Sequence, residues 1–192
     1  QVDIPVLDRG QYVDFESREH FEIQSSSAVL VGQFLAAEQA PDPNVRGTAQ
    51  PGDAETGDPA FLLAVPVEQY LDRYVILAPD KYLYDYASVT APLGTTVLMD
   101  GEPIPPGIFE VVGDGDYAVA RVPIEDGMHT FASVPEEGDS SGLPIGIIVY
   151  GYDQYVSYAY PGGLSLNLIN GCRLDSDCPL EARCIEGECQ RP

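Results

Sequence analysis

The chain has 192 residues, enough for one domain with a sizeable core and a small appendage. Its 31 acidic and 9 basic residues give a formal net charge of −22, and a surface this negative repels nucleic acid and anionic lipid. Composition therefore argues against nucleic acid as a partner, and no apolar segment is long enough for direct membrane insertion. A chain that starts at Gln1 indicates a processed, exported protein.

The first part of the chain is expected to form strands. Aromatic and β-branched residues predict one strand around residues 12–15 and a second at residues 20–23. The apolar run at residues 28–36 follows a serine-rich turn and predicts a central strand buried on both faces. Residues 38–59 mix proline, glycine and acidic side chains, which predicts a long exposed loop. Loops of this length in a compact domain are usually functional or mobile.

From residue 61 onward, short apolar or alternating runs separated by turn residues recur at regular spacing. The expected strands are residues 61–67, 74–78, 84–91, 95–100, 107–112, 116–124, 128–134 and 164–169. Asp100-Gly101 is the strongest turn signal between them. The stretch 143–166 predicts a hairpin that turns at Asp153-Gln154. About ten short strands without a convincing helix predict an all-β fold, an antiparallel β-sandwich of jelly-roll-like form.

The sandwich is expected to span residues 1–170, and a Cys-rich module residues 171–192. Cys172, Cys178, Cys184 and Cys189 have the spacing C-x5-C-x5-C-x4-C, which predicts a tail stapled by disulfides, each worth roughly 3 kcal/mol. Three pairings are possible, and we favour Cys172 with Cys184 and Cys178 with Cys189. A zinc site is the alternative, but it usually needs more closely spaced cysteine pairs.

Two acidic pairs are candidate calcium ligands. Asp114 and Asp116 flank a glycine, and Asp175 and Asp177 repeat the spacing in the tail. Calcium binds six to eight oxygens from such loops, but neither segment matches the EF-hand pattern. An ordinary Asp-Gly turn is the explanation we favour over calcium. No other cofactor is expected.

Catalytic residues are sparse. The sequence has no G-x-S-x-G nucleophile motif, and His20 and His129 are its two histidines. His129 follows a turn and starts a strand, where a hydrogen-bonded surface role is commoner than a catalytic one. Paired carboxylates could support glycoside hydrolysis, but the chain has no tryptophan for a sugar platform.

Tyrosines are the most distinctive side chains. Alternation predicts that Tyr82, Tyr84 and Tyr86 share one face of a strand, as do Tyr150, Tyr152, Tyr158 and Tyr160 along the hairpin. An apolar ring with a polar tip suits a half-exposed contact face, although packing across the sheet explains such a row too.

The body of the chain, residues 28–166, resembles the N-terminal domain family of IgGFc-binding protein, in the form carried by large secreted bacterial proteins. The likeness is to the C-terminal part of the usual domain, and the tail resembles short Cys-rich modules that follow such domains. The residues that carry it are 32–34, 57–59, 65–70, 100–101, 126–129, 144–146, 150–152 and 157–163. The resemblance implies an extracellular β-rich module with an adhesive or matrix role.

These observations predict a non-enzymatic extracellular structural or adhesion module that contacts protein, either itself or another surface or matrix protein. A self-assembling subunit of a surface polymer or filament is a specific form of this hypothesis, because a truncated domain leaves a strand edge open to a neighbour's strand. The alternatives are a calcium-dependent adhesin and, behind it, a secreted hydrolase.

Overall fold

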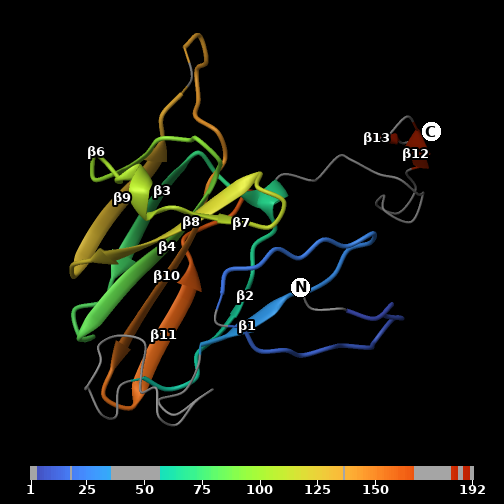
Figure 1. The fold of residues 1–192 in the computed structure, drawn as a ribbon, viewed down its shortest axis with the longest axis horizontal. Helices are drawn as coiled ribbons and strands as arrows, with labels where there is room; N and C mark the ends of the chain where they lie inside the picture. The colour runs from blue at the N-terminus through green and yellow to red at the C-terminus, as the bar shows by residue number, and fades with distance from the viewer. Residues whose placement is uncertain are drawn as a thin grey trace.

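The computed structural model describes residues 4–17, 19–35, 57–135, 137–166, 183–185 and 188–190. The fold is all-β and antiparallel, as expected, and its body is a two-sheet sandwich (Figure 1). One sheet has the order β11-β10-β4-β8-β7 and the other has the order β3-β9-β5-β6. Their strands are β3 (Arg73–Ala78), β4 (Tyr84–Pro92), β5 (Val97–Met99), β6 (Glu102–Pro103), β7 (Glu110–Val112), β8 (Tyr117–Ile124), β9 (Gly127–Ser133), β10 (Gly146–Asp153) and β11 (Val156–Pro161).

Alternation builds the core between the two sheets. In β3 and β4 every second residue is buried, as the period of two predicts. The chain crosses repeatedly between the sheets, because β4, β8 and β10 belong to one sheet and β3, β5 and β9 to the other. The largest fully buried side chains are those of Phe131, Ile145, Val89, Val97 and Val149.

Turn chemistry sets the hairpins. Met99 pairs with Glu102, so Asp100 and Gly101 form the two-residue turn, with φ angles of 52° and 87°. Positive φ at both positions is what an Asp-Gly hairpin turn requires. The hairpin β10–β11 is confirmed too, but Asp153 pairs with Val156, so its turn lies one residue later than predicted.

Tyr160 ties the edge of one sheet to the other. Its hydroxyl donates to the Leu77 carbonyl at 2.7 Å and accepts from the Leu77 amide at 3.1 Å. Leu77 lies in β3, an edge strand of the four-stranded sheet, and Tyr160 lies in β11, an edge strand of the five-stranded sheet. One side chain therefore satisfies both exposed backbone groups at this position and closes that side of the sandwich.

We expect Tyr160→Phe to lower the free energy of unfolding by about 1 kcal/mol, because it removes two hydrogen bonds that water partly replaces. Urea denaturation measures the change. Tyr12→Phe is the control, since Tyr12 is 85% exposed. Equal midpoints for the two variants would contradict a clamping role for the Tyr160 hydroxyl.

The strands predicted in the first part of the chain are wrong. Among residues 4–17 and 19–31 the structure has no strand, so neither residues 12–15 nor 20–23 form one. The predicted buried strand at residues 28–36 is reduced to β1 (Gly32–Phe34), which is exposed and pairs only with β2 (Phe61–Leu63). An apolar run shows that a segment favours burial, but it does not show that another part of the same chain covers it.

Other boundaries also differ from expectation. The strand predicted at residues 61–67 ends at Leu63, and the 3-10 turn η1 (Val67–Gln69) follows. The first part of the predicted strand 107–112 is the 3-10 turn η2 (Pro106–Ile108), where prolines favour a turn. Residues 164–166 are irregular.

Two predicted regions lie largely outside the described residues. The loop at residues 38–59 is described only from residue 57, and the tail only in β12 (Arg183–Ile185) and β13 (Glu188–Gln190). These strands pair with Cys184 opposite Cys189. Cys172 and Cys178 lie outside the described residues, so the disulfide pairing stays a prediction, as does the boundary at residue 170.

Candidate functional site

The hairpin register divides the predicted tyrosine row between two faces. Tyr150 lies opposite Tyr86, whereas Tyr158 lies opposite Gly151. Directly opposed residues share a face and neighbours along a strand do not, so Tyr150 and Tyr158 point to opposite sides of the sheet. The prediction of one shared face was wrong, because a two-residue turn pairs even positions of β10 with odd positions of β11.

One set faces the interior around Asp85, which is 6% exposed. The Tyr158 hydroxyl donates a short hydrogen bond to the Asp85 carboxylate, and the Tyr82 ring packs edge-on against Tyr158 at 4.5 Å. The Tyr160 ring stacks on that of Tyr158, with the ring centroids 6.1 Å apart. Burial raises the pKa of Asp85 and of Tyr158, so the pair fills a polar position inside the sandwich.

The other set faces outward from the five-stranded sheet. Tyr86 stacks on Tyr150 at 5.4 Å, and Tyr150 meets Tyr152 edge-on at 5.8 Å. Tyr84 lies opposite Tyr152 and shares this face. Burial raises the pKa of Tyr150 to about 12. All seven predicted tyrosines are buried or half-buried, so packing explains them, and a role in partner contact stays a prediction.

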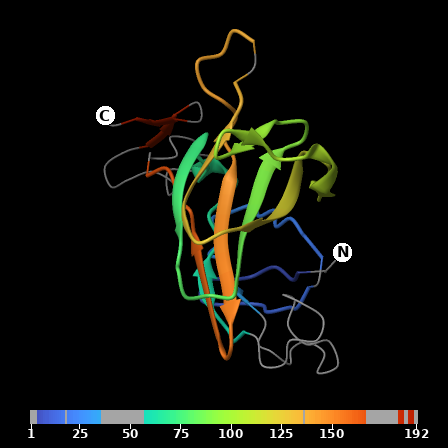
Figure 2. The same ribbon diagram turned by 90° about the vertical axis from the view of Figure 1, so that its left-hand side faces the viewer.

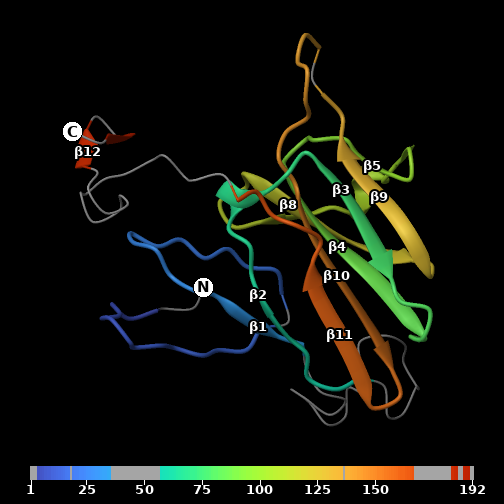
Figure 3. The same ribbon diagram turned by 180° about the vertical axis from the view of Figure 1, so that it is seen from behind.

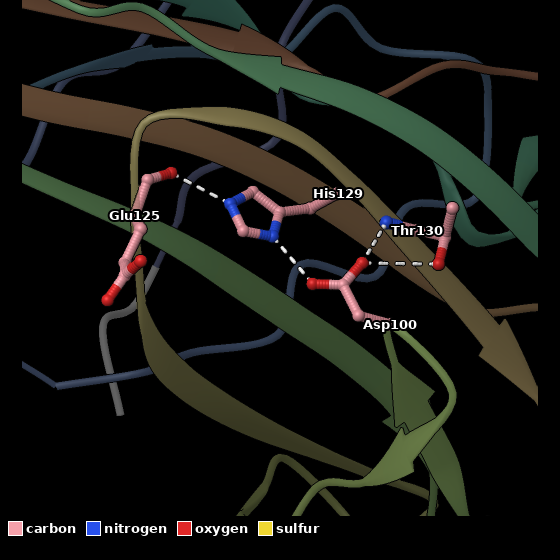
Figure 4. Close-up of polar contacts among 4 residues, drawn as sticks. All are labelled: Asp100, Glu125, His129 and Thr130. Carbon is pink, nitrogen blue, oxygen red and sulfur yellow. Dashed lines mark hydrogen bonds and ion pairs between the residues drawn. The ribbon is translucent and has the colours of Figure 1, made fainter.

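His129 forms the best-defined polar cluster at the surface (Figure 4). Its Nδ1 lies 2.7 Å from the Asp100 carboxylate and its Nε2 lies 2.7 Å from the Glu125 carbonyl oxygen. Asp100 also accepts hydrogen bonds from the amide and the hydroxyl of Thr130. Both partners of the imidazole are acceptors, so the ring is best satisfied when both nitrogens carry protons. With both nitrogens engaged, His129 offers no free lone pair for use as a general base.

Burial and hydrogen bonding shift the pKa of His129 in opposite directions, and hydrogen bonding has the larger effect. Burial lowers the pKa of His129, but hydrogen bonds to Asp100 and to the Glu125 carbonyl raise it more, so the net pKa lies above the ordinary 6.5. The hydrogen bond from His129, helped by that from Thr130, lowers the pKa of Asp100 below its ordinary 3.8. The pair locks the β5–β6 turn against the start of β9.

These shifts predict a pH dependence of stability. A raised histidine pKa stabilises the fold below pH 6.5, and that contribution is lost as pH rises through the folded-state pKa. A lowered aspartate pKa stabilises above pH 3.8 and is lost as pH falls further. We expect His129→Gln to cost about 1 kcal/mol at pH 5.5, discounted for the 45% exposure of Asp100, and less at pH 8.5.

Chemical denaturation at the two pH values measures this effect, and His20→Gln is the matched control. Burial and the charge of Arg121 lower the pKa of His20, so removing it should change stability with the opposite dependence on pH. The same cost for His129→Gln at both pH values would contradict a charged His129.

The predicted calcium ligands are only partly placed. Asp114 and Asp116 lie in the turn between β7 and β8, where the Asp114 amide donates to Glu22 at 3.4 Å. Within the described part of the chain, no three His, Cys, Asp or Glu side chains gather into a group that could hold a metal ion. Asp175 and Asp177 lie outside the described residues, so calcium binding stays a prediction.

Sequence reasoning missed an exposed apolar surface, the outer side of the four-stranded sheet, which we call the open face. The register places its side chains on one side of β3, β9, β5 and β6. They are Arg73, Val75, Leu77, Leu98, Pro103, Met128, Thr130 and Ala132. Val75 is 60% exposed, Leu77 62% and Met128 72%. The available signal was β3 itself, in which both alternating sets are largely apolar.

The open face is hollowed at its centre. Thr130 and Ala132 are short side chains on the central strand β9, and larger neighbours rise around them. The result is a shallow depression of about 210 Å³, lined by residues that include Arg73, Val75 and Leu98. This space suits one apolar side chain of a partner, with the Arg73 guanidinium beside it for a carboxylate.

No helix in the described part of the chain is long and apolar enough to cross a membrane.

Searches of the curated proteins and of the solved structures find no match to the chain. The family model described as IgGFc binding protein matches residues 2–151. The match covers most of the sandwich and the whole N-terminal segment, and it indicates a non-enzymatic module that binds protein partners. The chain therefore belongs to the IgGFc binding protein family.

Proposed function

We propose that this chain is an extracellular structural or adhesion module that contacts another protein through the open face. The observation that supports this role is the exposure of Val75, Leu77 and Met128 together on one side of the four-stranded sheet. Contiguous apolar patches of this kind mark interaction sites on soluble proteins. Scattered single apolar residues would need no such explanation.

Charge supports the same role. The chain carries a net charge of −22, yet none of the side chains of the open face is acidic, and Arg73 is its charged member. Asp100 stands at the rim, where its carboxylate is engaged by His129 and Thr130. Depletion of charge at the centre of a patch is the compositional mark of a protein interface.

A matched pair of variants tests the proposal. Val75→Glu puts a charge on the open face, and Val111→Glu puts the same charge on β7 at the same 60% exposure. Each full-length variant is expressed by the cells that make the protein, and the fraction retained in the cell-surface and matrix material is measured. We expect Val75→Glu to be released and Val111→Glu to be retained.

Equal retention of the two variants, both folded, would overturn a contact role for the open face. The calcium-dependent adhesin remains an alternative that melting temperatures with calcium and with chelator decide. A hydrolase built on His129 has no support from its geometry, because both ring nitrogens are engaged.

A further inference from the structure

A second unpartnered surface lies in the same chain. Residues 4–17 and 19–35, which we call the N-terminal arm, have no regular structure except β1 and expose many apolar side chains. Val6 is 96% exposed, Tyr12 85% and Leu30 80%. Ordering a segment costs conformational entropy, and burial of apolar side chains usually offsets that cost. The arm leaves its apolar side chains exposed, which indicates that another molecule covers them in an assembly.

The N-terminal arm carries apolar side chains next to carboxylates, and the open face has no carboxylate of its own. Apolar residues are followed directly by carboxylates in Leu7-Asp8, Val13-Asp14, Phe15-Glu16 and Phe21-Glu22. The open face presents an apolar depression with Arg73 beside it, and Arg73 makes no ion pair within the described part of the chain. An apolar side chain next to a carboxylate therefore complements both features of the depression.

Geometry separates the two surfaces within one molecule. The arm lies beyond the outer side of the five-stranded sheet, where Glu22 reaches the β7–β8 turn and His20 lies near Arg121 (Figures 1 and 3). The four-stranded sheet forms the opposite layer, and its open face points away from the arm (Figures 2 and 3). In the structure the arm therefore does not cover the open face of its own chain.

We propose that the N-terminal arm of one copy docks on the open face of the next, which joins the molecules head to tail. Two different surfaces on opposite sides make a heterologous contact, and such contacts generate open filaments or rings rather than closed two-fold dimers. This inference rests on the proposed function and names a second copy of this chain as the partner.

Salt gives a first signature of this contact. Each copy carries a net charge of −22, so copies repel one another at low ionic strength, whereas the contact itself is mainly apolar. Assembly should therefore increase with sodium chloride between about 0.01 and 0.15 M, as the screening length falls from about 30 to about 8 Å.

Two double variants separate the two halves of the contact. The face variant carries Val75→Glu and Leu77→Glu, and the arm variant carries Val6→Glu and Tyr12→Glu at the most exposed positions of the arm. The control carries Leu83→Glu and Leu143→Glu, which add the same charge at 61% and 41% exposure outside both surfaces. Circular dichroism establishes that each full-length variant is folded, and sedimentation velocity measures its assembly.

We expect the wild type and the control to form concentration-dependent oligomers. Each double variant alone should need at least about tenfold more protein to do so. An equimolar mixture of the two double variants should form heterodimers and stop there, because it contains one intact arm and one intact face. A contact between an arm and a face, in an open chain or in a ring, gives this pattern.

Three results would overturn the inference. They are a wild type that stays monomeric in moderate salt, an arm variant that still assembles, and a mixture that forms no heterodimer. An arm variant that forms dimers while the face variant does not would show face-to-face pairing instead. A monomeric wild type leaves the proposed function intact if Val75→Glu is still released from the cell surface, so the two failures are distinguishable.

Discussion

Gly151→Ala is expected to lower the free energy of unfolding by about 3 kcal/mol, since it overpacks a closed site and disturbs a buried polar pair. Gly151 faces the interior opposite Asp85 and Tyr158. A Cβ atom there would lie 2.8 Å from the Tyr84 carbonyl oxygen, and it would also meet the Tyr158 ring and the Asp85 carboxylate. The Tyr84 backbone cannot move away without breaking the β4–β10 pairing, so the overlap is not relieved by a small shift.

Denaturant titration measures this loss, and Gly107→Ala is the matched control. A Cβ atom at Gly107 would meet nothing within 4 Å, so that variant should change stability by no more than about 0.5 kcal/mol. Near-equal stability of the two variants would show that the tyrosine cluster around Asp85 is looser than the structure has it.

Phe131→Ala is expected to lower the free energy of unfolding by about 3 to 5 kcal/mol. Phe131 is fully buried on β9, where it lies opposite Tyr74 on one side and Met99 on the other. Removing the ring loses its transfer free energy and leaves a cavity between the two sheets. Thermal or urea denaturation with the linear extrapolation gives the value.

Met128→Ala is the control on the same strand. Met128 is 72% exposed, so its truncation should leave stability within about 0.5 kcal/mol of the wild type while it removes apolar surface from the open face. A large loss for Met128→Ala would mean that the open face is packed against part of its own chain.

The sandwich was predictable because its strands bury one face. The alternation in β4 and the Asp-Gly turn at residues 100–101 are local signals, and the structure bears both out. Strand pairing was not predictable, because a turn such as Pro92-Leu93-Gly94 joins strands of different sheets as readily as strands of one hairpin. The tyrosine row failed for a related reason, since a two-residue turn places even positions of β10 opposite odd positions of β11 and so divides the row between the two faces.

The candidate contact surfaces could not be read from periodicity. Val75 and Leu77 look like core residues in the sequence, and only the sheet order shows that no second layer covers them. The run at residues 28–36 was assigned to the core for the same reason. Both cases concern apolar residues that the described chain leaves exposed. The contact of His129 with Asp100 depends on strand register, which periodicity does not reveal.

Oxidative footprinting of Met128 tests the central claim most directly. The oxidation rate of its thioether is compared between the dilute purified chain and the protein in its native material. Leu83, which is 61% exposed outside the open face, is the internal reference. If the open face makes the proposed contact, Met128 is oxidised several-fold more slowly in the native material while Leu83 keeps its rate. An unchanged rate at Met128 would contradict the account.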